Sequence, residues 1–181
     1  MKVLLLNGPN LNMLGVREPE IYGRETLSSI EDRLATYGAK RDVEVTCFQS
    51  NHEGALIDCI HAAHGIFDGI VYNPGAHTHY SYALRDALGS IDAPAVEVHI
   101  SDVDAREPFR AVSVIAPACV AQVKGLGVAG YAVAFDLLLD GASERLGEGF
   151  ETRAHGKVIV GDADGPRRLE EGVDFQLPCD F

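Results

Sequence analysis

The feature of this sequence that most constrains its fold is a regular alternation of short apolar runs with longer helical patterns. The apolar runs have the length of β-strands and cover residues 3–6, 43–48, 70–72, 95–100 and 120–123. Strands separated by helices in this way are typical of a parallel sheet with helices on both faces. Five such strands in a chain of 181 residues predict an α/β fold, a flavodoxin-like three-layer sandwich with a five-stranded parallel sheet.

Polar residues mark where the helices of this pattern begin. Thr26 is expected to cap the first helix, and Ser50 with Glu53 forms an S-x-x-E capping box before the second. Thr78 is expected to cap a third helix, and residues 131–139 predict a nearly apolar fourth.

The composition changes near residue 141 and divides the chain into two parts. Residues 1–141 are predicted to form the flavodoxin-like domain, and residues 142–181 an acidic C-terminal extension that packs on this domain or on an oligomer interface. The extension has one strand-like run at 157–160. Its D-A-D-G segment is similar to a calcium loop, but the first ligand position would fall on Val160, which has no side-chain oxygen, so calcium is not expected.

The charge balance and the cysteines limit the possible partners and compartments. A net charge of −12 argues against nucleic acid or an anionic membrane as a partner, because both require a basic surface. The N-terminal apolar run is too short for a signal peptide, and the nearly apolar run 112–123 contains a proline and is shorter than a membrane span. Four cysteines without paired or metal-ligand spacing predict free thiols in a reducing, cytoplasmic setting: Cys47, Cys59, Cys119 and Cys179.

Polar residues follow four of the predicted strands at their carboxyl ends, the edge where open α/β sheets bind ligands. The segments are N-G-P-N-L-N (7–12), Q-S-N-H-E-G (49–54), N-P-G-A-H-T-H (73–79) and E-V-H-I-S-D (97–102). Asparagine, serine and glycine also favour turns, but four such segments on one edge predict a polar pocket.

Common cofactors do not fit this edge. The first strand–helix connection has no G-x-G-x-x-G, and Pro9 removes a backbone donor where a phosphate would lie, which argues against a dinucleotide. The same turn lacks the hydroxyl groups of a flavodoxin-type flavin site. His61 and His64 lie one helical turn apart without further ligands, and His77 and His79 have no cysteine or carboxylate cluster beside them, so no metal is expected.

The first loop places Arg17 five residues before Tyr22. A neighbouring cation can lower the pKa of a phenol from its ordinary value of about 10, so that it acts as a base near neutral pH. This pair suggests an enzyme. The structural alternatives are that Tyr22 anchors the loop, that Arg17 forms an exposed ion pair with Glu18, and that His99 is a hydrogen-bonded core histidine.

Long and unusual motifs occur in six segments, in order, from about residue 2 to about residue 140. The segments cover residues 7–23, 49–58, 73–88, 96–101, 106–110 and 125–131. In these motifs the chain resembles type II 3-dehydroquinate dehydratase. The resemblance implies the flavodoxin-like fold, a homododecamer built from trimers, and a reaction without metal or cofactor.

The activity implied by the resemblance is that of a lyase, which removes water from 3-dehydroquinate to give 3-dehydroshikimate. This reaction serves the shikimate pathway of aromatic amino acid biosynthesis or quinate catabolism. Removal of a proton next to a ketone requires a base and stabilisation of the enolate. By resemblance, Tyr22 is the base, Arg17 holds it as phenolate, and Asn12 orients a water at the enolate oxygen. His99 then protonates the departing hydroxyl, and Glu97 orients its ring.

A second group of residues is implied to bind the substrate. The substrate carboxylate would contact Ser101 and the backbone amides around Ile100, and Asp86 of a neighbouring subunit would reach the loop that closes over the site. The ring hydroxyls of the substrate and the side of its ring that carries the carboxylate would contact Asn73, His79 and Arg110.

Several residues differ from the usual pattern of that family. Tyr80 and Tyr82 are larger than usual and are expected to alter the trimer packing, while His77 and Pro108 replace other residue types. Asp102 adds a negative charge beside the expected carboxylate site and is expected to weaken substrate binding. Two alternatives therefore stay open: a dehydratase of a modified ring such as an amino analogue, and a non-catalytic binding paralogue.

Overall fold

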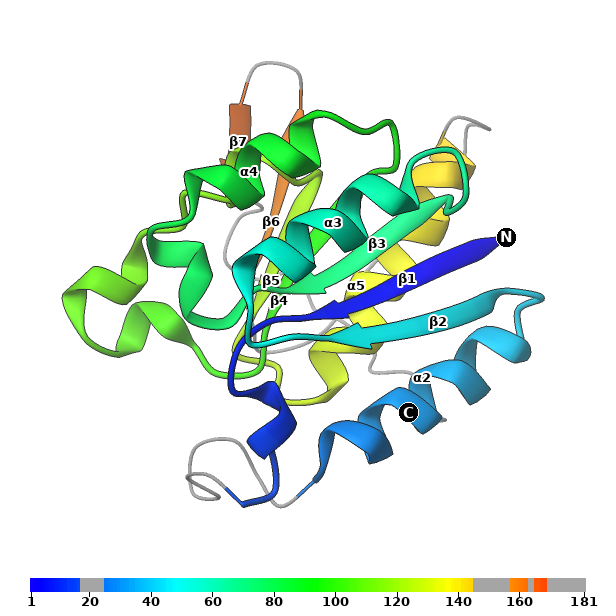
Figure 1. The fold of residues 1–181 in the computed structure, drawn as a ribbon, viewed down its shortest axis with the longest axis horizontal. Helices are drawn as coiled ribbons and strands as arrows, with labels where there is room; N and C mark the ends of the chain where they lie inside the picture. The colour runs from blue at the N-terminus through cyan, green and yellow to red at the C-terminus, as the bar shows by residue number, and fades with distance from the viewer. Residues whose placement is uncertain (17–24, 145–156, 163–164, 169–181) are drawn as a thin grey trace.

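The computed structural model describes residues 1–16, 25–144, 157–162 and 165–168, in which one sheet lies between two helical layers (Figure 1). The strands are β1 (Lys2–Asn7), β2 (Glu44–Gln49), β3 (Gly69–Asn73), β4 (Ala95–His99), β5 (Ala121–Lys124), β6 (Lys157–Asp162) and β7 (Gly165–Arg168). The α-helices are α2 (Leu27–Ala39), α3 (Glu53–Ala63), α4 (Tyr82–Gly89) and α5 (Ala129–Glu144). Short 3-10 helices are η1 (Leu11–Met13), η2 (Gly75–His79), η3 (Val103–Ala105), η4 (Pro108–Ala111) and η5 (Ala116–Ala118).

The strand order is β2-β1-β3-β4-β5-β6-β7, and the first five of these strands are parallel. The order 2-1-3-4-5 is that of flavodoxin-like folds, so the predicted fold class is confirmed. Asn7 at the end of β1 lies opposite both Gln49 and Asn73, which end the two neighbouring strands. The register therefore brings the polar strand ends together at one edge of the sheet.

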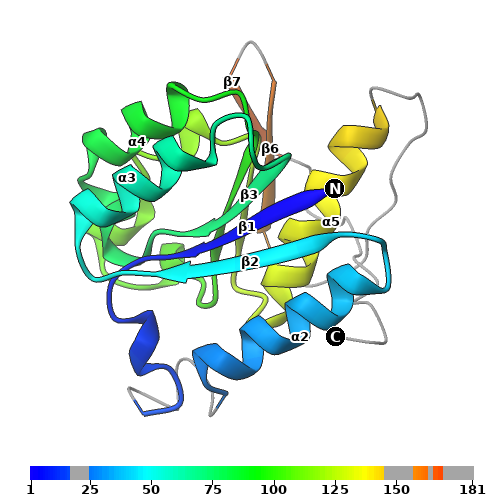
Figure 2. The ribbon, with the colours of Figure 1, turned by 45° about the vertical axis from the view of Figure 1, so that its right-hand side comes forward.

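The C-terminal part of the chain adds two antiparallel strands to this sheet. β6 pairs antiparallel with β5, and β7 pairs antiparallel with β6, at the end of the sheet opposite β2 (Figure 2). The sheet thus has seven strands, two more than the parallel part that was predicted. The strand-like run at 157–160 lies within β6.

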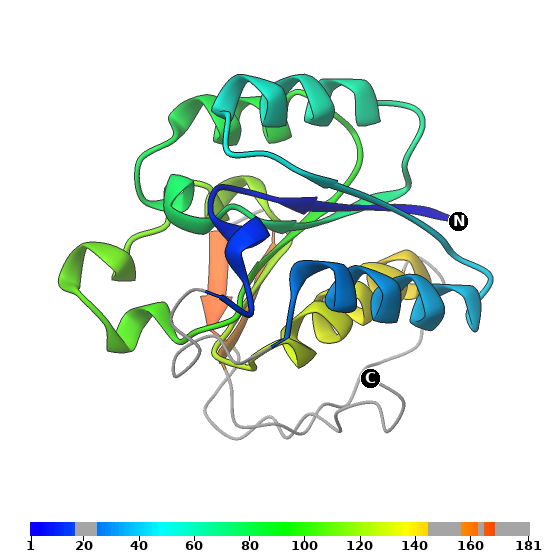
Figure 3. The ribbon, with the colours of Figure 1, turned by 60° about the horizontal axis from the view of Figure 1, so that its bottom comes forward.

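The helices cover the two faces of the sheet in pairs. α3 and α4 lie over one face, and α2 and α5 over the other (Figure 3). Successive residues of a strand point to opposite faces, so Leu5 packs with Phe135 of α5, whereas Leu4 and Leu6 pack with Leu56 of α3. Of the helices that the structure describes, none has the length and apolarity needed to cross a membrane.

Two of the helix caps expected from the sequence can be compared with the structure. Thr26 caps α2 as predicted, since its Oγ1 accepts a hydrogen bond from the backbone N–H of Ser29 at 3.2 Å. The predicted capping box of Ser50 and Glu53 is wrong, because α3 begins at Glu53 with His52 as its N-cap. Ser50 Oγ instead accepts from the backbone N–H of His52 at 3.0 Å, which stabilises the turn before the helix.

The third expected cap is also wrong by one turn. Ser81 caps α4 and accepts from the N–H of Leu84 at 3.1 Å, whereas Thr78 lies in η2. The Thr78 hydroxyl donates instead to the buried carboxylate of Glu97 at 2.5 Å. A buried carboxylate requires donors, and this requirement of tertiary packing outweighs the local capping preference.

Candidate active site

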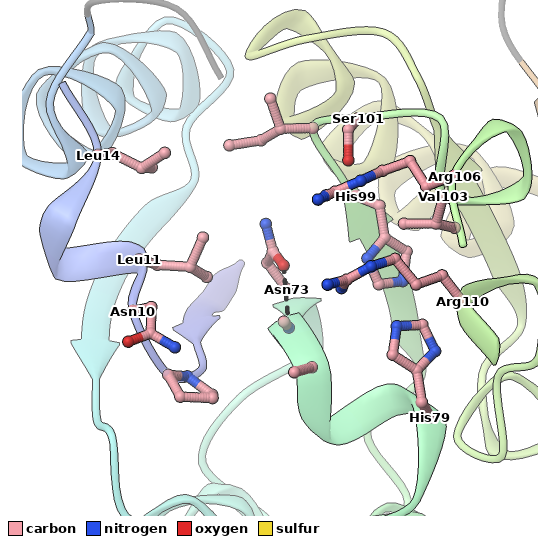
Figure 4. A pocket seen from close by; sticks show the side chains of 14 residues that line it. Asn10, Leu11, Leu14, Asn73, His79, His99, Ser101, Val103, Arg106 and Arg110 are labelled. Carbon is pink, nitrogen blue, oxygen red and sulfur yellow. Dashed lines mark hydrogen bonds between the residues drawn. The ribbon is translucent and has the colours of Figure 1, made fainter. Parts of the chain in front are cut away.

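A cleft lies at the carboxyl edge of the sheet, between the ends of β1, β3 and β4 (Figure 4). The chain leaves β1 toward one side of the sheet and β3 toward the other, so this is the switch point at which doubly wound sheets bind ligands. The cleft lies where the sequence predicts a polar pocket. Of the site residues named from the sequence, those that line it are Asn73, His79, His99, Ile100, Ser101 and Arg110.

His99 and Glu97 form a hydrogen-bonded pair at the end of β4. They are two residues apart and lie on the same face of the strand. Glu97 Oε1 is 2.6 Å from His99 Nε2, and Glu97 is fully buried. An ionised carboxylate can only accept, so His99 donates from Nε2 and has Nδ1 left for a ligand.

Two hydroxyl groups complete the surroundings of Glu97. Thr78 donates to Oε1, and Ser113 Oγ lies 3.0 Å from Oε2. Burial alone would raise the pKa of Glu97, but the hydrogen bonds from His99, Thr78 and Ser113 hold that pKa below its ordinary value. The ionised carboxylate can therefore stabilise a positive charge on His99. Sequence reasoning missed both hydroxyls, because only the tertiary structure brings them to Glu97.

Asn73 is held by a chain of hydrogen bonds behind the cleft. Its Nδ2 donates to the hydroxyl of Tyr131 at 2.8 Å, and that hydroxyl donates to Asn7 Oδ1 at 2.9 Å. Burial raises the pKa of Tyr131, which keeps the hydroxyl protonated as a donor. The N–H of Gly75 donates to Asn73 Oδ1 at 3.2 Å (Figure 4). These contacts determine which way the amide of Asn73 faces.

His79 and Arg110 lie next to one another on the same wall of the cleft (Figure 4). His79 Nδ1 is 2.8 Å from the carbonyl oxygen of Val112, so Nδ1–H donates and Nε2 of the neutral ring can accept. Burial lowers the pKa of His79 and favours this neutral form. Arg110 donates from Nε to Glu107 Oε2 at 2.7 Å, and its guanidinium points into the cleft.

Further cleft residues were missed in the sequence. Arg106 extends its guanidinium into the cleft from the same side as Arg110, although only Arg110 of the R-E-P-F-R segment was predicted (Figure 4). Leu11 and Leu14 form an apolar wall facing the two arginines. Their i, i+3 spacing in the polar first loop was the available signal.

Of the named residues that the structure describes, Asn12, Asp86 and Glu97 do not line the cleft. Asn12 lies in η1 and is exposed, and Asp86 is exposed on α4. Arg17 and Tyr22 lie outside the described residues.

The residues that differ from the family pattern also lie outside the cleft lining. Asp102 Oδ1 accepts from the N–H of Asp104 at 3.1 Å and caps η3. Tyr80 and Tyr82 are 60% and 61% exposed, and Pro108 begins η4. Within the part of the chain whose placement is described, no three His, Cys, Asp or Glu side chains are grouped so as to hold a metal ion.

Comparison with known proteins assigns the chain to one family. The model of the family Dehydroquinase class II matches residues 1–139. The 3-dehydroquinate dehydratase of Anoxybacillus flavithermus is 59% identical over 140 residues, which are 77% of this chain and 95% of the relative. That of Bacillus cytotoxicus is 56% identical over 147 residues, 81% of this chain and 98% of the relative.

Solved structures agree with these matches. The type II dehydroquinase from Butyrivibrio crossotus is 52% identical with a TM-score of 0.76, covering 77% of this chain and 97% of that one. The enzyme of the same type from Propionibacterium acnes is 41% identical with a TM-score of 0.74, covering 77% and 96%. The protein therefore belongs to the class II dehydroquinase family.

Proposed function

We propose that this protein removes water from 3-dehydroquinate to give 3-dehydroshikimate through an enolate intermediate. The relatives described above carry the name of this activity. In the structure, the observation that carries the proposal is the His99–Glu97 pair in the wall of a cleft that also holds two arginines. A histidine paired with an ionised carboxylate can give and regain a proton near neutral pH.

The proposed reaction begins with removal of the proton next to the ketone. Tyr22 takes this proton as phenolate, Arg17 stabilises the phenolate by its fixed positive charge, and Asn12 orients a water at the enolate oxygen. The enolate then expels the hydroxyl group, which receives a proton from His99, so that one water leaves. Glu97 stabilises the protonated ring of His99 before this transfer.

The carboxylate of the substrate and its ring hydroxyls are bound by different residues of the cleft. The carboxylate is bound by Ser101 and by backbone amides around Ile100, since both residues line the cleft. Arg110 and the acceptor nitrogen of His79 contact the ring hydroxyls, as does the amide of Asn73. A small ring with one carboxylate and several hydroxyls matches this set of donors and acceptors.

The active assembly in this proposal is a homododecamer built from trimers. Support comes from Asp86, which is exposed on α4 and lies outside the cleft lining, as a residue acting on a neighbouring subunit must. Tyr80, Tyr82 and Phe109 form further exposed apolar area, each more than half exposed. The extension 142–181 packs on the domain or on an interface of this assembly, and no nucleic acid or membrane takes part. Limited proteolysis that removes the extension without changing the assembly would contradict its interface role.

The compartment proposed for the reaction is the cytoplasm, where it serves the shikimate pathway or quinate catabolism. Support comes from the thiols: Cys47, Cys59 and Cys119 are free cysteines in the structure. Free thiols of this kind are typical of reducing compartments.

The test is ultraviolet absorbance after addition of 3-dehydroquinate to the wild-type protein and to Tyr22→Phe. The product is a conjugated enone that absorbs, whereas the substrate is not conjugated. Absorbance is expected to rise with the wild type and not with the variant. If the wild type binds 3-dehydroquinate without any rise, the proposed reaction is wrong, and a modified ring or a pure binding role takes its place.

A further inference from the structure

From the contacts behind the cleft wall we infer that Lys124 is a positioning residue for the anion-binding side of the cleft. Its ammonium pairs with Asp104, and its positive charge thereby offsets the negative charge of that carboxylate in the segment that carries Ser101 and Arg106. The inference rests on the proposed function, because the anion concerned is the carboxylate of the proposed substrate.

The segment 101–106 carries residues that line the cleft and two aspartates that do not. Ser101, Val103 and Arg106 line the cleft, and the two aspartates between them do not. Asp102 accepts from the N–H of Asp104 at 3.1 Å, and Asp104 Oδ1 is 3.0 Å from Lys124 Nζ. Both carboxylates are thus held by partners that lie outside the cleft lining.

Lys124 is built into the sheet rather than placed on the surface. It ends β5 opposite His99 of β4, and it is only 5% exposed. The next residues bind the same wall, since the N–H of Gly125 donates to the carbonyl of His99 at 3.2 Å and that of Gly127 to the carbonyl of Ile100 at 3.0 Å. A buried ammonium is stable only when it is paired, so the position of Lys124 is coupled to that of Asp104.

The charges of Asp104 and Lys124 are close enough to the cleft to act on an anion that is bound there. Consecutive Cα atoms lie about 3.8 Å apart, so the backbone of Asp104 is within about 8 Å of that of Arg106. This is comparable to the screening length of about 8 Å at physiological ionic strength, and screening is weaker still around buried groups. Without Lys124, the carboxylate of Asp104 would repel an anion in the cleft and would compete for the guanidinium of Arg106.

The test compares Lys124→Met with Lys124→Met/Asp104→Asn and with Asp104→Asn alone. For each protein, KM and kcat for 3-dehydroquinate are measured by absorbance, and Kd for quinate, a non-reacting carboxylate with a similar ring, by calorimetry. In Lys124→Met we expect KM and Kd to rise about tenfold while kcat changes less than about threefold, since the lost charge lies outside the reacting atoms. The double variant is expected to return KM and Kd to within about threefold of wild type, because a neutral pair replaces the ion pair.

The outcomes separate a charge effect from a packing effect. Unchanged constants in Lys124→Met overturn the inference, and so does a double variant that binds as weakly as Lys124→Met. If Lys124→Met does not fold, Lys124→Arg and Asp104→Asn decide: the inference requires that neither raises Kd, and a rise in either overturns it. A wild type that binds quinate but does not convert 3-dehydroquinate contradicts the proposed function, while the quinate series still tests Lys124.

Discussion

The proposed role of His99 as general acid depends on the carboxylate of Glu97 beside it. Glu97 is fully buried, accepts hydrogen bonds from Thr78 and Ser113, and has a pKa held below its ordinary value. The pair can be anticipated from the i, i+2 spacing on a strand. The two hydroxyls that keep Glu97 ionised cannot, because they come from η2 and from residue 113, far along the chain.

Replacement of Glu97 by Gln is expected to lower kcat for 3-dehydroquinate by about 100-fold or more, because a neutral amide does not stabilise the protonated ring of His99. KM is expected to change less than about threefold, since Glu97 does not line the cleft. Steady-state kinetics check both values. Glu44→Gln, at an exposed carboxylate on β2, is the matched control and should retain wild-type rates. A Glu97→Gln enzyme with nearly wild-type kcat would show that this carboxylate has no part in the proton transfer.

The same substitution has a consequence for stability that depends on pH. Because the folded-state pKa of Glu97 lies below its ordinary value of about 4.5, the ionised group stabilises the fold fully above that pH. This stabilisation is lost as the pH falls through the lower folded-state pKa. Urea unfolding should therefore show wild type more stable than Glu97→Gln at pH 7, with the difference shrinking below about pH 4. A difference that stays constant between pH 7 and pH 3 would mean that Glu97 does not titrate with a lowered pKa.

At the scale of elements, the helix starts separate what local sequence specifies from what it does not. Thr26 caps α2 as its sequence predicts, since its hydroxyl accepts from the N–H of Ser29. Thr78 has the same chemistry but donates to Glu97, and Ser81 caps α4 in its place. A capping pattern shows that a hydroxyl can bind backbone N–H groups, but not whether a buried partner elsewhere binds it more strongly.

Ser81→Ala is expected to lower the free energy of unfolding by about 1 kcal/mol, because the N–H of Leu84 loses its acceptor at the start of α4. Chemical denaturation measures this change. Thr36→Ala is the control within a helix: Thr36 is an exposed residue of α2 whose hydroxyl donates to the carbonyl of Asp32, and its loss should cost less than about 0.5 kcal/mol. Equal effects of the two substitutions would contradict the assignment of Ser81 as the cap.

At the scale of the whole molecule, the C-terminal strands change what the sheet presents to solvent. The family match ends at residue 139, and β6 then pairs along the whole of β5, so that β5 is not an edge strand. Unpaired strand edges promote association between chains unless they are short, charged or covered. Among the described residues, those that line the cleft all precede residue 111, and β6 and β7 are not among them.

A chain that ends at residue 144 is therefore expected to keep its kcat within about threefold but to associate more readily, because the backbone of β5 becomes exposed. Light scattering at increasing concentration, beside the full-length protein, measures the association. If the shortened chain stays as monodisperse as the full-length protein, β6 does not act as an edge cover. If its turnover is lost, the extension supports the cleft from outside its lining.

The sequence by itself determined the features that have a local period. Strand and helix alternation predicts the parallel sheet, and the i, i+2 rule places Glu97 and His99 on one face of β4. Polar segments at the strand ends locate the cleft, since the carboxyl ends of parallel strands share one edge.

Only the tertiary structure decided the contacts between distant residues. The hydroxyl of Tyr131 donates a hydrogen bond to Asn7, 124 residues away, and thereby orients Asn73. The ammonium of Lys124 donates to the carboxylate of Asp104, 20 residues away. Such contacts depend on strand register and on the path of the connecting loops, which local periodicity does not encode. Their strength comes from burial, because a polar group that loses water must find its partner in the folded chain.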